Sequence, residues 1–231
     1  MARIFVMSDV HGQQTAFFDV LCQAQFSSED VLYILGDLID RGPDGIALLQ
    51  YVQQQPNIHL LMGNHEELMC RSLQDEWGVF ECWIGNGGTP TYETYLKLPK
   101  DEQQSIRTYL EELPLYQELT INGEHYLLVH AGLCYDENLP WDLQLAQQTR
   151  DDLLWIRTPF LSQSWEDSPF TVVHGHTPTL SYGKYKACSP TREGISIELK
   201  RIGLDCGAGH LYQLGLYCLT DQTSYYYTWK I

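Results

Sequence analysis

The first third of the chain alternates between short apolar runs and stretches with a helical pattern. Apolar runs at residues 3–7, 31–35 and 58–62 have the length and composition of buried strands. Between them, apolar residues recur at helical spacing over residues 16–24 and 46–52, and Pro56 ends the second pattern because proline lacks a backbone donor. This order predicts βαβ units around a buried parallel sheet.

The rest of the chain predicts helices first and strands afterwards. Residues 74–115 read as a mainly helical insertion with a helix-like run at 101–113, and no linker rich in proline, serine or glycine brackets it. Strands are expected at residues 119–121, 126–129, 170–173, 211–219 and 225–229. We therefore expect an α/β fold with a single domain spanning residues 1–231 and a helical insertion at 74–115.

Polar residues follow five of these predicted strands. They are Asp9 and His11, then Asp37, Asp40 and Arg41, then Asn64 and His65, then His130, and finally His174 and His176. Ligands in α/β sheets bind beyond the carboxyl ends of the strands, so we expect these loops to converge. Carboxylate oxygens together with imidazole nitrogens suit manganese, iron or zinc, and five of the eight histidines fall in these loops. The joint pattern predicts a metal site, although a lone histidine or aspartate would be ordinary loop chemistry.

Composition narrows the classes of partner. The 231 residues carry 14 basic and 30 acidic side chains, for a net charge of −16, and 44% of residues are hydrophobic. Such an acidic surface disfavours a nucleic-acid groove, which works by neutralising phosphates with Lys and Arg. We expect no membrane span and no signal peptide, since the apolar run at the N-terminus is short. Seven cysteines without a C-x-x-C pair fit a reducing compartment, so a cytoplasmic protein is expected.

Three sequence blocks together resemble a known enzyme family. They are SDVHG at residues 8–12, GDLIDRG at 36–42 and GNHE at 63–66, followed in order by HAG at 130–132, LWIR at 154–157 and GHTP at 175–178. This chain resembles the phosphoprotein phosphatase family of serine/threonine phosphatases, in particular bacterial and phage members of the calcineurin-like metallophosphoesterase superfamily. The resemblance implies a central β-sandwich of mixed sheets flanked by helices.

The resemblance also implies two divalent metal ions, manganese first, with iron and zinc as alternatives. It assigns Asp9 and His11 to one ion, Asp37 as the bridge between both, and Asn64, His130 and His176 to the second ion. Hydrolysis would then proceed by direct attack of a hydroxide held between the ions, without a covalent phosphoenzyme. His174 precedes the GHTP block, so His176 is favoured as the ligand and His174 as a neighbour of the ligands.

Four further residues receive catalytic roles from the resemblance. His65 is the candidate general acid for the leaving oxygen, and Asp40 would accept the other ring hydrogen bond of His65. Arg41 and Arg157 would grip the phosphoryl oxygens, where a planar guanidinium binds in bidentate fashion. A surface ion pair of Arg41 with Asp40 or Asp44 is the alternative for that side chain.

Several alternatives stay open at this point. The expected substrate is a phosphoprotein or a phosphorylated small molecule, and relatives that hydrolyse dinucleoside polyphosphates share most blocks but typically lack the aspartate at position 40. A scaffold without activity is disfavoured because all six expected ligands are present. We expect Trp77, Trp83 and Trp155 to serve in packing and the turn at 86–88 to be a plain turn or part of a cleft wall. Basic residues at 184–201, including Lys184, Lys186, Arg192 and Arg201, form either a solvated loop or a partner-binding patch.

Overall fold

Two five-stranded sheets form the centre of the computed structural model, which describes residues 2–136, 138–184 and 194–230. The first sheet has the order β10 (Thr223–Thr228), β9 (Gln213–Cys218), β1 (Ile4–Met7), β2 (Val31–Ile34), β3 (Ile58–Leu60). The second has the order β4 (Tyr116–Ile121), β5 (Glu124–Val129), β6 (Thr171–His174), β8 (Arg201–Gly203), β7 (Ser196–Glu198). Strands β1, β2 and β3 run parallel, and so do β5, β6 and β8, while the pairs β1–β9, β9–β10, β4–β5 and β7–β8 are antiparallel.

The two sheets pack face to face because the central strands are apolar on both sides. In β1, Phe5 and Met7 face a core shared with helices, whereas Val6 between them faces the second sheet. In β6, Val173 faces the first sheet and Val172 faces the opposite way. Successive strand residues point to opposite faces, so a continuous apolar run fits a strand that is covered twice.

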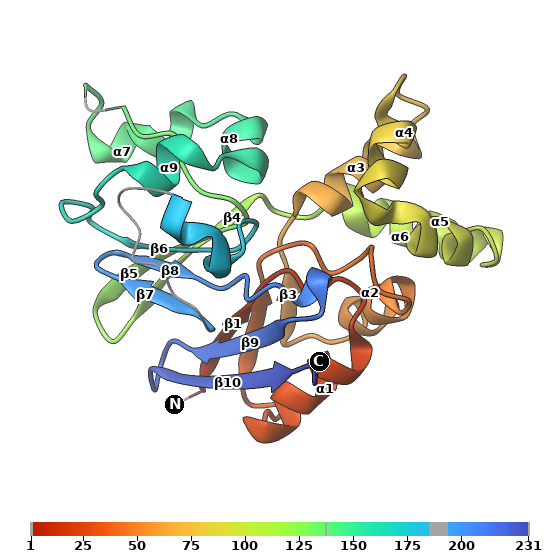
Figure 1. Cartoon of the computed structure of the whole chain (residues 1–231), viewed down its shortest axis with the longest axis horizontal. Coiled ribbons are helices and arrows are strands. Elements are labelled where there is room, and N and C mark those ends of the chain that lie inside the picture. The colour runs from red at the N-terminus through yellow and green to blue at the C-terminus, as the bar shows by residue number, and fades with distance from the viewer. Residues whose placement is uncertain (1, 137, 185–193, 231) are drawn as a thin grey trace.

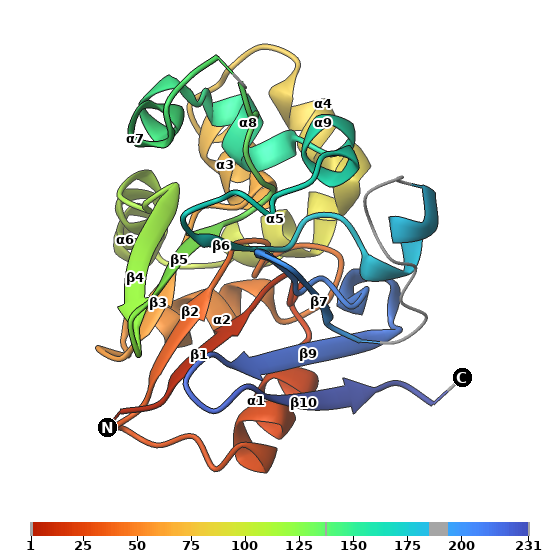
Figure 2. The same ribbon diagram turned by 90° about the vertical axis from the view of Figure 1, so that its left-hand side faces the viewer.

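Three groups of helices cover the sheets (Figures 1 and 2). Helices α1 (Gln14–Gln23) and α2 (Gly45–Gln53) pack on the outer face of the first sheet. Helices α3 (Asn64–Ser72), α4 (Val79–Trp83), a π-helical turn (Ile84–Gly88), α5 (Thr89–Tyr95) and α6 (Lys100–Glu111) gather together in Figure 1. Helices α7 (Trp141–Gln144), α8 (Arg150–Trp155) and α9 (Thr158–Ser162) lie beyond the second sheet. Short 3-10 turns are at Leu145–Gln147, Thr179–Lys184 and Ala208–His210.

The expected mixed α/β sandwich with flanking helices is confirmed. The sequence pattern missed α7, α8 and α9, because helices of four to six residues are too short to show a period. Among the described residues, no helix is both long and apolar enough to cross a membrane. The six cysteines within the described ranges are free thiols.

Candidate active site

Loops from both sheets meet at one place, because each sheet brings the carboxyl ends of three parallel strands to the same edge. The backbone N–H of His176, after β6, donates to Asp9 Oδ2, after β1, at 2.9 Å. The N–H of Gly175 donates to the carbonyl of His130, after β5, at 2.8 Å. The structure thus brings the candidate residues of the two halves of the chain into contact.

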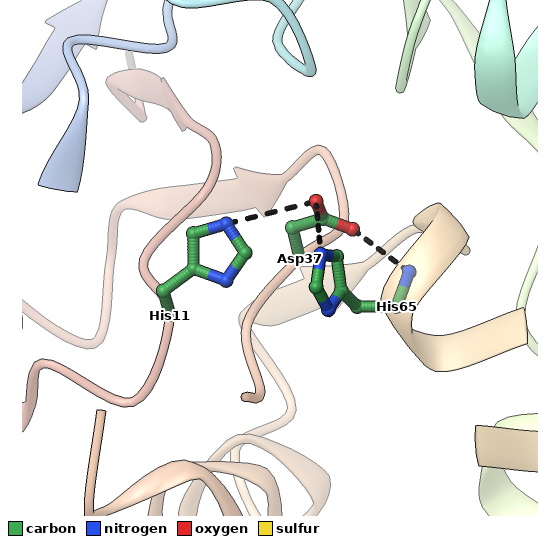
Figure 3. Close-up of side chains that lie close together, drawn as sticks. All are labelled: His11, Asp37 and His65. Atoms are coloured by element: carbon green, nitrogen blue, oxygen red, sulfur yellow. Dashed lines mark hydrogen bonds and ion pairs between the residues drawn. The ribbon is translucent and has the colours of Figure 1, made fainter. Parts of the chain in front are cut away.

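Asp37 lies between two imidazoles in the first cluster of metal-ligating side chains (Figure 3). Its Oδ2 is 3.7 Å from His11 Nε2 and 3.8 Å from His65 Nε2. A metal ion binds such atoms at about 2.0–2.2 Å, so two ligands of one ion lie roughly 3–3.6 Å apart. The 3.7 Å spacing of His11 and Asp37 is just above this range, so a small movement would let both bind one ion.

A second cluster shares the same carboxylate. Asp37 Oδ1 is 3.4 Å from His130 Nε2, and Asp37, His130 and His176 form a group with ligand atoms close together. Asn64 Oδ1 lies 2.9 Å from His130 Nε2 and 2.9 Å from His176 Nδ1. The four side chains follow four different strands, β2, β3, β5 and β6, and all of them are buried.

Asp9 borders the first cluster. Its Oδ1 lies 3.9 Å from His11 Nε2, while Oδ2 accepts from Ser8 Oγ at 2.5 Å and from the N–H of His176. Burial and the nearby Asp37 carboxylate raise the pKa of Asp9 to about 6. Two buried carboxylates this close call for a compensating positive charge.

The protonation pattern of the histidines fits a cation in this position. His11 Nδ1 lies 3.0 Å from the carbonyl oxygen of Ile39, so Nδ1 carries the proton and Nε2 carries a lone pair. That Nε2 is buried and has no hydrogen-bond partner among the described residues. Likewise, His130 Nδ1 donates to the carbonyl of Leu35 at 2.7 Å, which leaves its Nε2 to face Asn64 Oδ1. These lone pairs, with the carboxylates, make a donor set suited to divalent metals.

His65 is held by an aspartate next to the clusters. Its Nδ1 donates to Asp40 Oδ2 at 2.6 Å, and Arg41 Nη2 lies 3.1 Å from its Nε2. Burial lowers the pKa of His65, but the Asp37 and Asp40 carboxylates outweigh it and leave that pKa above its usual value. The arrangement holds one ring nitrogen firmly and leaves the other at the metal-binding side.

The two candidate arginines lie at the rim of the site, and both are exposed. The Arg41 side chain points to His65 and packs close to Gly87 and Gly209, so its guanidinium stands at the site instead of pairing with Asp44. Arg157 precedes α9. Burial and His130 lower the pKa of His176 most, and the positive charge of Arg157 lowers that pKa further. Each therefore offers a cation at the edge of the clusters.

Glu66, which the sequence blocks contain but to which no role was given, organises the loop after β2. Its buried carboxylate accepts backbone N–H groups of Asp37 at 2.8 Å, Leu38 at 2.9 Å and Gly63 at 3.0 Å. The same side chain thus closes the start of α3 and fixes the backbone that carries Asp37. Burial and Asp37 raise the pKa of Glu66 to about 7.

His174 points away from the clusters. Its ring contacts Phe160 and stacks on Tyr182, and burial lowers its pKa to about 3. It is a neutral core histidine, whereas His176 joins the second cluster. Arg201 also differs from expectation, because it is buried and paired with Glu198 and cannot belong to an exposed basic patch. Lys186 and Arg192 of that expected patch lie outside the described residues.

Three residues near the site were missed or misread by the sequence analysis. Asp205, after β8, is buried, and burial together with Asp9 raises its pKa well above the usual value. Trp83, expected to be packing only, donates through Nε1 to Asp40 Oδ2 at 2.8 Å. Thr91 Oγ1 accepts from the N–H of Asp40 at 2.9 Å. Asp205 could have been found as a polar residue that follows a strand. However, β8 has only three residues, which is too short to predict from the sequence.

The chain matches the calcineurin-like phosphoesterase family over residues 2–211 and belongs to that family. With the two buried His/Asp clusters, this defines it as a metallophosphoesterase with a site able to hold divalent metal ions.

Curated relatives of the chain include two kinds of enzyme. Serine/threonine-protein phosphatase 2 of Escherichia coli strain K12 is 30% identical over 157 residues, which cover 66% of this chain and 67% of that protein. The corresponding Salmonella typhimurium protein is 28% identical over 156 residues, covering 66% and 70%. The symmetrical bis(5'-nucleosyl)-tetraphosphatase of Klebsiella pneumoniae strain 342 is 29% identical over 152 residues, covering 64% of this chain and 48% of that protein.

Solved structures agree with the fold. A chain provisionally assigned as a diadenosine tetraphosphatase superposes with a TM-score of 0.70 at 20% identity, covering 100% of this chain and 95% of its own. A protein serine/threonine phosphatase from Saccharomyces cerevisiae gives a TM-score of 0.61 at 18% identity, covering 100% and 80%. At these identities the likeness supports the fold alone.

Proposed function

We propose that this metallophosphoesterase is a protein serine/threonine phosphatase that hydrolyses phosphomonoesters. The observation that carries the proposal is the Asp40–His65 pair, with His65 Nδ1 at 2.6 Å from Asp40 Oδ2 and the opposite ring nitrogen beside the metal clusters. A serine or threonine alkoxide is a poor leaving group and needs a proton, and a histidine held in this way can deliver one.

We assign the metal ligands as two sets that share Asp37. Its Oδ2 faces His11 and its Oδ1 faces His130, so Asp37 would be the residue that both ions share. Asp9 completes the first set, and Asn64 and His176 complete the second. Two-metal sites hold their ions roughly 3.5–4 Å apart, which a single bridging carboxylate can span. The mixed oxygen and nitrogen donors favour manganese, with iron or zinc as alternatives.

His65 is assigned as a general acid and not as a third ligand of the first ion, although it belongs to the first cluster. Its Nε2 lies 3.1 Å from Arg41 Nη2, and a guanidinium hydrogen can only donate to that nitrogen. If Nε2 of His65 were a metal ligand, its lone pair would point to the metal ion. The positive charge of Arg41 would then lie next to the positive charge of that ion. As a general acid, His65 would carry its proton on Nε2 once the Arg41 guanidinium turns from that nitrogen to a phosphoryl oxygen of the substrate.

Each remaining group has one task in the proposed reaction. When bound, the divalent ions activate water at neutral pH and neutralise charge on the phosphoryl group. Arg41 and Arg157 bind phosphoryl oxygens from the rim. Asp40 holds the His65 ring and stabilises its protonated form, and His65 donates its proton to the leaving oxygen. We infer that residues 1–231 act as one catalytic unit, since loops from both sheets contribute to the site.

Hydrolysis of dinucleoside polyphosphates is the second candidate. It is favoured by the likeness to curated relatives named as symmetrical bis(5'-nucleosyl)-tetraphosphatases. Because those enzymes typically lack an aspartate at the position of Asp40, the Asp40–His65 pair favours the monoester reaction. The substrate is thus a phosphoprotein, with a small phosphorylated molecule as the alternative.

A parallel assay separates these candidates. The Mn²⁺-loaded protein is tested on a phosphoserine peptide, a phosphotyrosine peptide and diadenosine tetraphosphate under the same conditions. We expect the highest kcat/KM on the phosphoserine peptide. A higher value on diadenosine tetraphosphate would assign the chain to the second candidate, and a higher value on phosphotyrosine would refute the serine/threonine assignment.

A further inference from the structure

Trp83, at the end of α4, reaches the proposed proton donor through one hydrogen bond. Its side chain is fully buried, and its Nε1 donates to Asp40 Oδ2 at 2.8 Å. The same oxygen accepts the proton of His65 Nδ1 at 2.6 Å. One carboxylate oxygen therefore joins the indole of the helical segment to the imidazole of the site.

The surrounding segment is built to hold this contact. A Cβ at Gly88 would stand 2.5 Å from Trp83 Nε1, so only glycine leaves room for the indole there. The carbonyl of Gly87 accepts from the N–H of Arg41 at 2.9 Å, and Thr91 Oγ1 accepts from the N–H of Asp40. Residues 83–91 thus hold both Asp40 and its neighbour Arg41 from one side.

The indole matters because Asp40 has few other partners. Its side chain is fully buried, and its Oδ1 has no hydrogen-bond partner among the described residues. A buried carboxylate depends on its donors for both its ionised form and its orientation. Among the described residues the side-chain donors to Asp40 are His65 and Trp83, and Trp83 is the one that takes no part in the proton transfer itself.

We propose that Trp83 is a positioning residue for proton donation, a role that rests on the proposed phosphatase function. Trp83 fixes the Asp40 carboxylate so that it orients the His65 ring toward the leaving oxygen. Removing the indole donor leaves the carboxylate free to rotate, and His65 then delivers its proton less well. The defect is therefore largest for substrates whose leaving group depends most on protonation.

The test compares two substrates of different leaving group. For Trp83→Phe, we expect kcat/KM on a phosphoserine peptide to fall about 10-fold or more, but less than about 3-fold on p-nitrophenyl phosphate, whose leaving group needs little protonation. The matched control is Trp165→Phe, which also removes a buried indole donor, here to the carbonyl of Phe160 at 3.1 Å. The control should lower both activities equally or not at all.

Two further measurements distinguish positioning from a packing defect. Gly88→Ala keeps the indole but displaces it, so it should reproduce the dependence on leaving group even if Trp83→Phe folds poorly. Trp83→Phe added to His65→Asn should bring no further loss on the phosphoserine peptide. Equal losses on both substrates for Trp83→Phe and Gly88→Ala, or full additivity with His65→Asn, would overturn the proposal.

A readout independent of activity separates this proposal from the phosphatase function. Proton NMR of the wild-type protein should show a far-downfield Nδ1 proton of His65, assigned by its loss in His65→Asn. That signal should persist in Trp165→Phe and move upfield or vanish in Trp83→Phe. An unchanged signal in Trp83→Phe refutes the positioning role. If the wild-type protein is inactive on every phosphoester, the proposed function is refuted, but the NMR measurement still tests the contact between Trp83 and Asp40.

Discussion

Side chains of the site extend from backbone in a conformation that most residues avoid. A positive φ between 50° and 71° is found at Asp9, His11, Asp37, Asp40, Arg41 and His176. Such conformations cost about 1–3 kcal/mol each for residues other than glycine, and they concentrate where function demands a particular direction of the side chain. Glycine would relieve the strain at each of these positions but would remove the functional group, so the fold has to bear the cost.

At the residue scale, His65 gives the most direct test of general-acid catalysis. For His65→Asn we expect turnover on a phosphoserine peptide to fall by a factor of order 10²–10⁴, because the leaving oxygen loses its proton donor. Metal content, measured by elemental analysis, should remain that of the wild type. A loss of bound metal in this variant would make His65 a ligand and contradict the assigned role.

A second residue pair, Arg3 and Asp30, connects stability to pH away from the site. Asp30 is buried, its Oδ2 lies 2.8 Å from Arg3 Nη2, and Ser27 N–H donates to the same oxygen at 2.8 Å. Burial raises the pKa of Asp30, but the bonds from Arg3 and Ser27 outweigh it and lower that pKa below 3.8. The ionised form therefore stabilises the fold at neutral pH, and this stabilisation is lost as the pH falls through the lowered pKa.

We expect Asp30→Asn to reduce the free energy of unfolding by about 1–3 kcal/mol at pH 7. The difference from the wild type should shrink in acid, as Asp30 of the wild type becomes protonated. Urea unfolding at several pH values measures both effects. The control is Glu111→Gln, since the pair of Arg107 and Glu111 is exposed and should contribute little. A difference that stays constant with pH would contradict the assignment.

At the scale of elements, α3 and the loop after β2 behave as one unit through Glu66. In Glu66→Gln, one carboxylate oxygen is replaced by an NH₂ group that cannot accept from the backbone N–H groups of Asp37 or Leu38. The loop that presents Asp37 should loosen, so divalent-metal affinity is expected to fall about 10- to 100-fold.

Isothermal titration of the metal-free variant with Mn²⁺ measures this affinity. Glu67→Gln is a neighbouring control on the same helix, because Glu67 contacts Arg150 and Trp155 of α8 and not the loop that carries Asp37. Equal losses of affinity in the two variants would indicate general damage to α3 in place of a specific effect on the loop.

The elements differ in how far the sequence could predict them. The sequence predicts β1 and β2 because buried strands give continuous apolar runs. The polar residues after these strands could be predicted as a site because metal-binding residue types recur after one strand after another. The link from Trp83 to Asp40 spans 43 residues and depends on tertiary packing, which no local pattern encodes. His174 and His176 lie two residues apart; the GHTP block favours His176 as the ligand, and the fold shows the reason, because the two rings point in different directions.

At the scale of the whole molecule, the site joins two sheets that elsewhere pack against each other mainly through apolar side chains. Buried carboxylates from both sheets, including Asp9, Asp37 and Asp205, face one another there. Bound cations offset their repulsion, and a ligand that binds only the folded state raises its stability. The metal should therefore stabilise the complete fold as well as support activity.

Chelation tests this expectation. Treatment with EDTA should abolish hydrolysis of p-nitrophenyl phosphate and lower the midpoint of thermal unfolding, and added Mn²⁺ should restore both. Ca²⁺ prefers all-oxygen sites, so adding Ca²⁺ in a parallel sample should restore less activity and a smaller part of the unfolding midpoint than Mn²⁺ does. Failure of every divalent ion to recover activity would contradict the two-metal assignment, and an unchanged midpoint would contradict the stabilising role.

The position of β9 in the first sheet has a consequence for the order of synthesis on the ribosome. Strand β1, at residues 4–7, is made long before one of its two neighbours, β9, which comes from residues 213–218. Until that segment emerges, one edge of β1 has no strand to pair with, and an unpaired apolar edge invites pairing with other chains. The nascent chain therefore stays vulnerable to aggregation while the residues between β1 and β9 are made, and the hairpin of β9 and β10 completes this sheet.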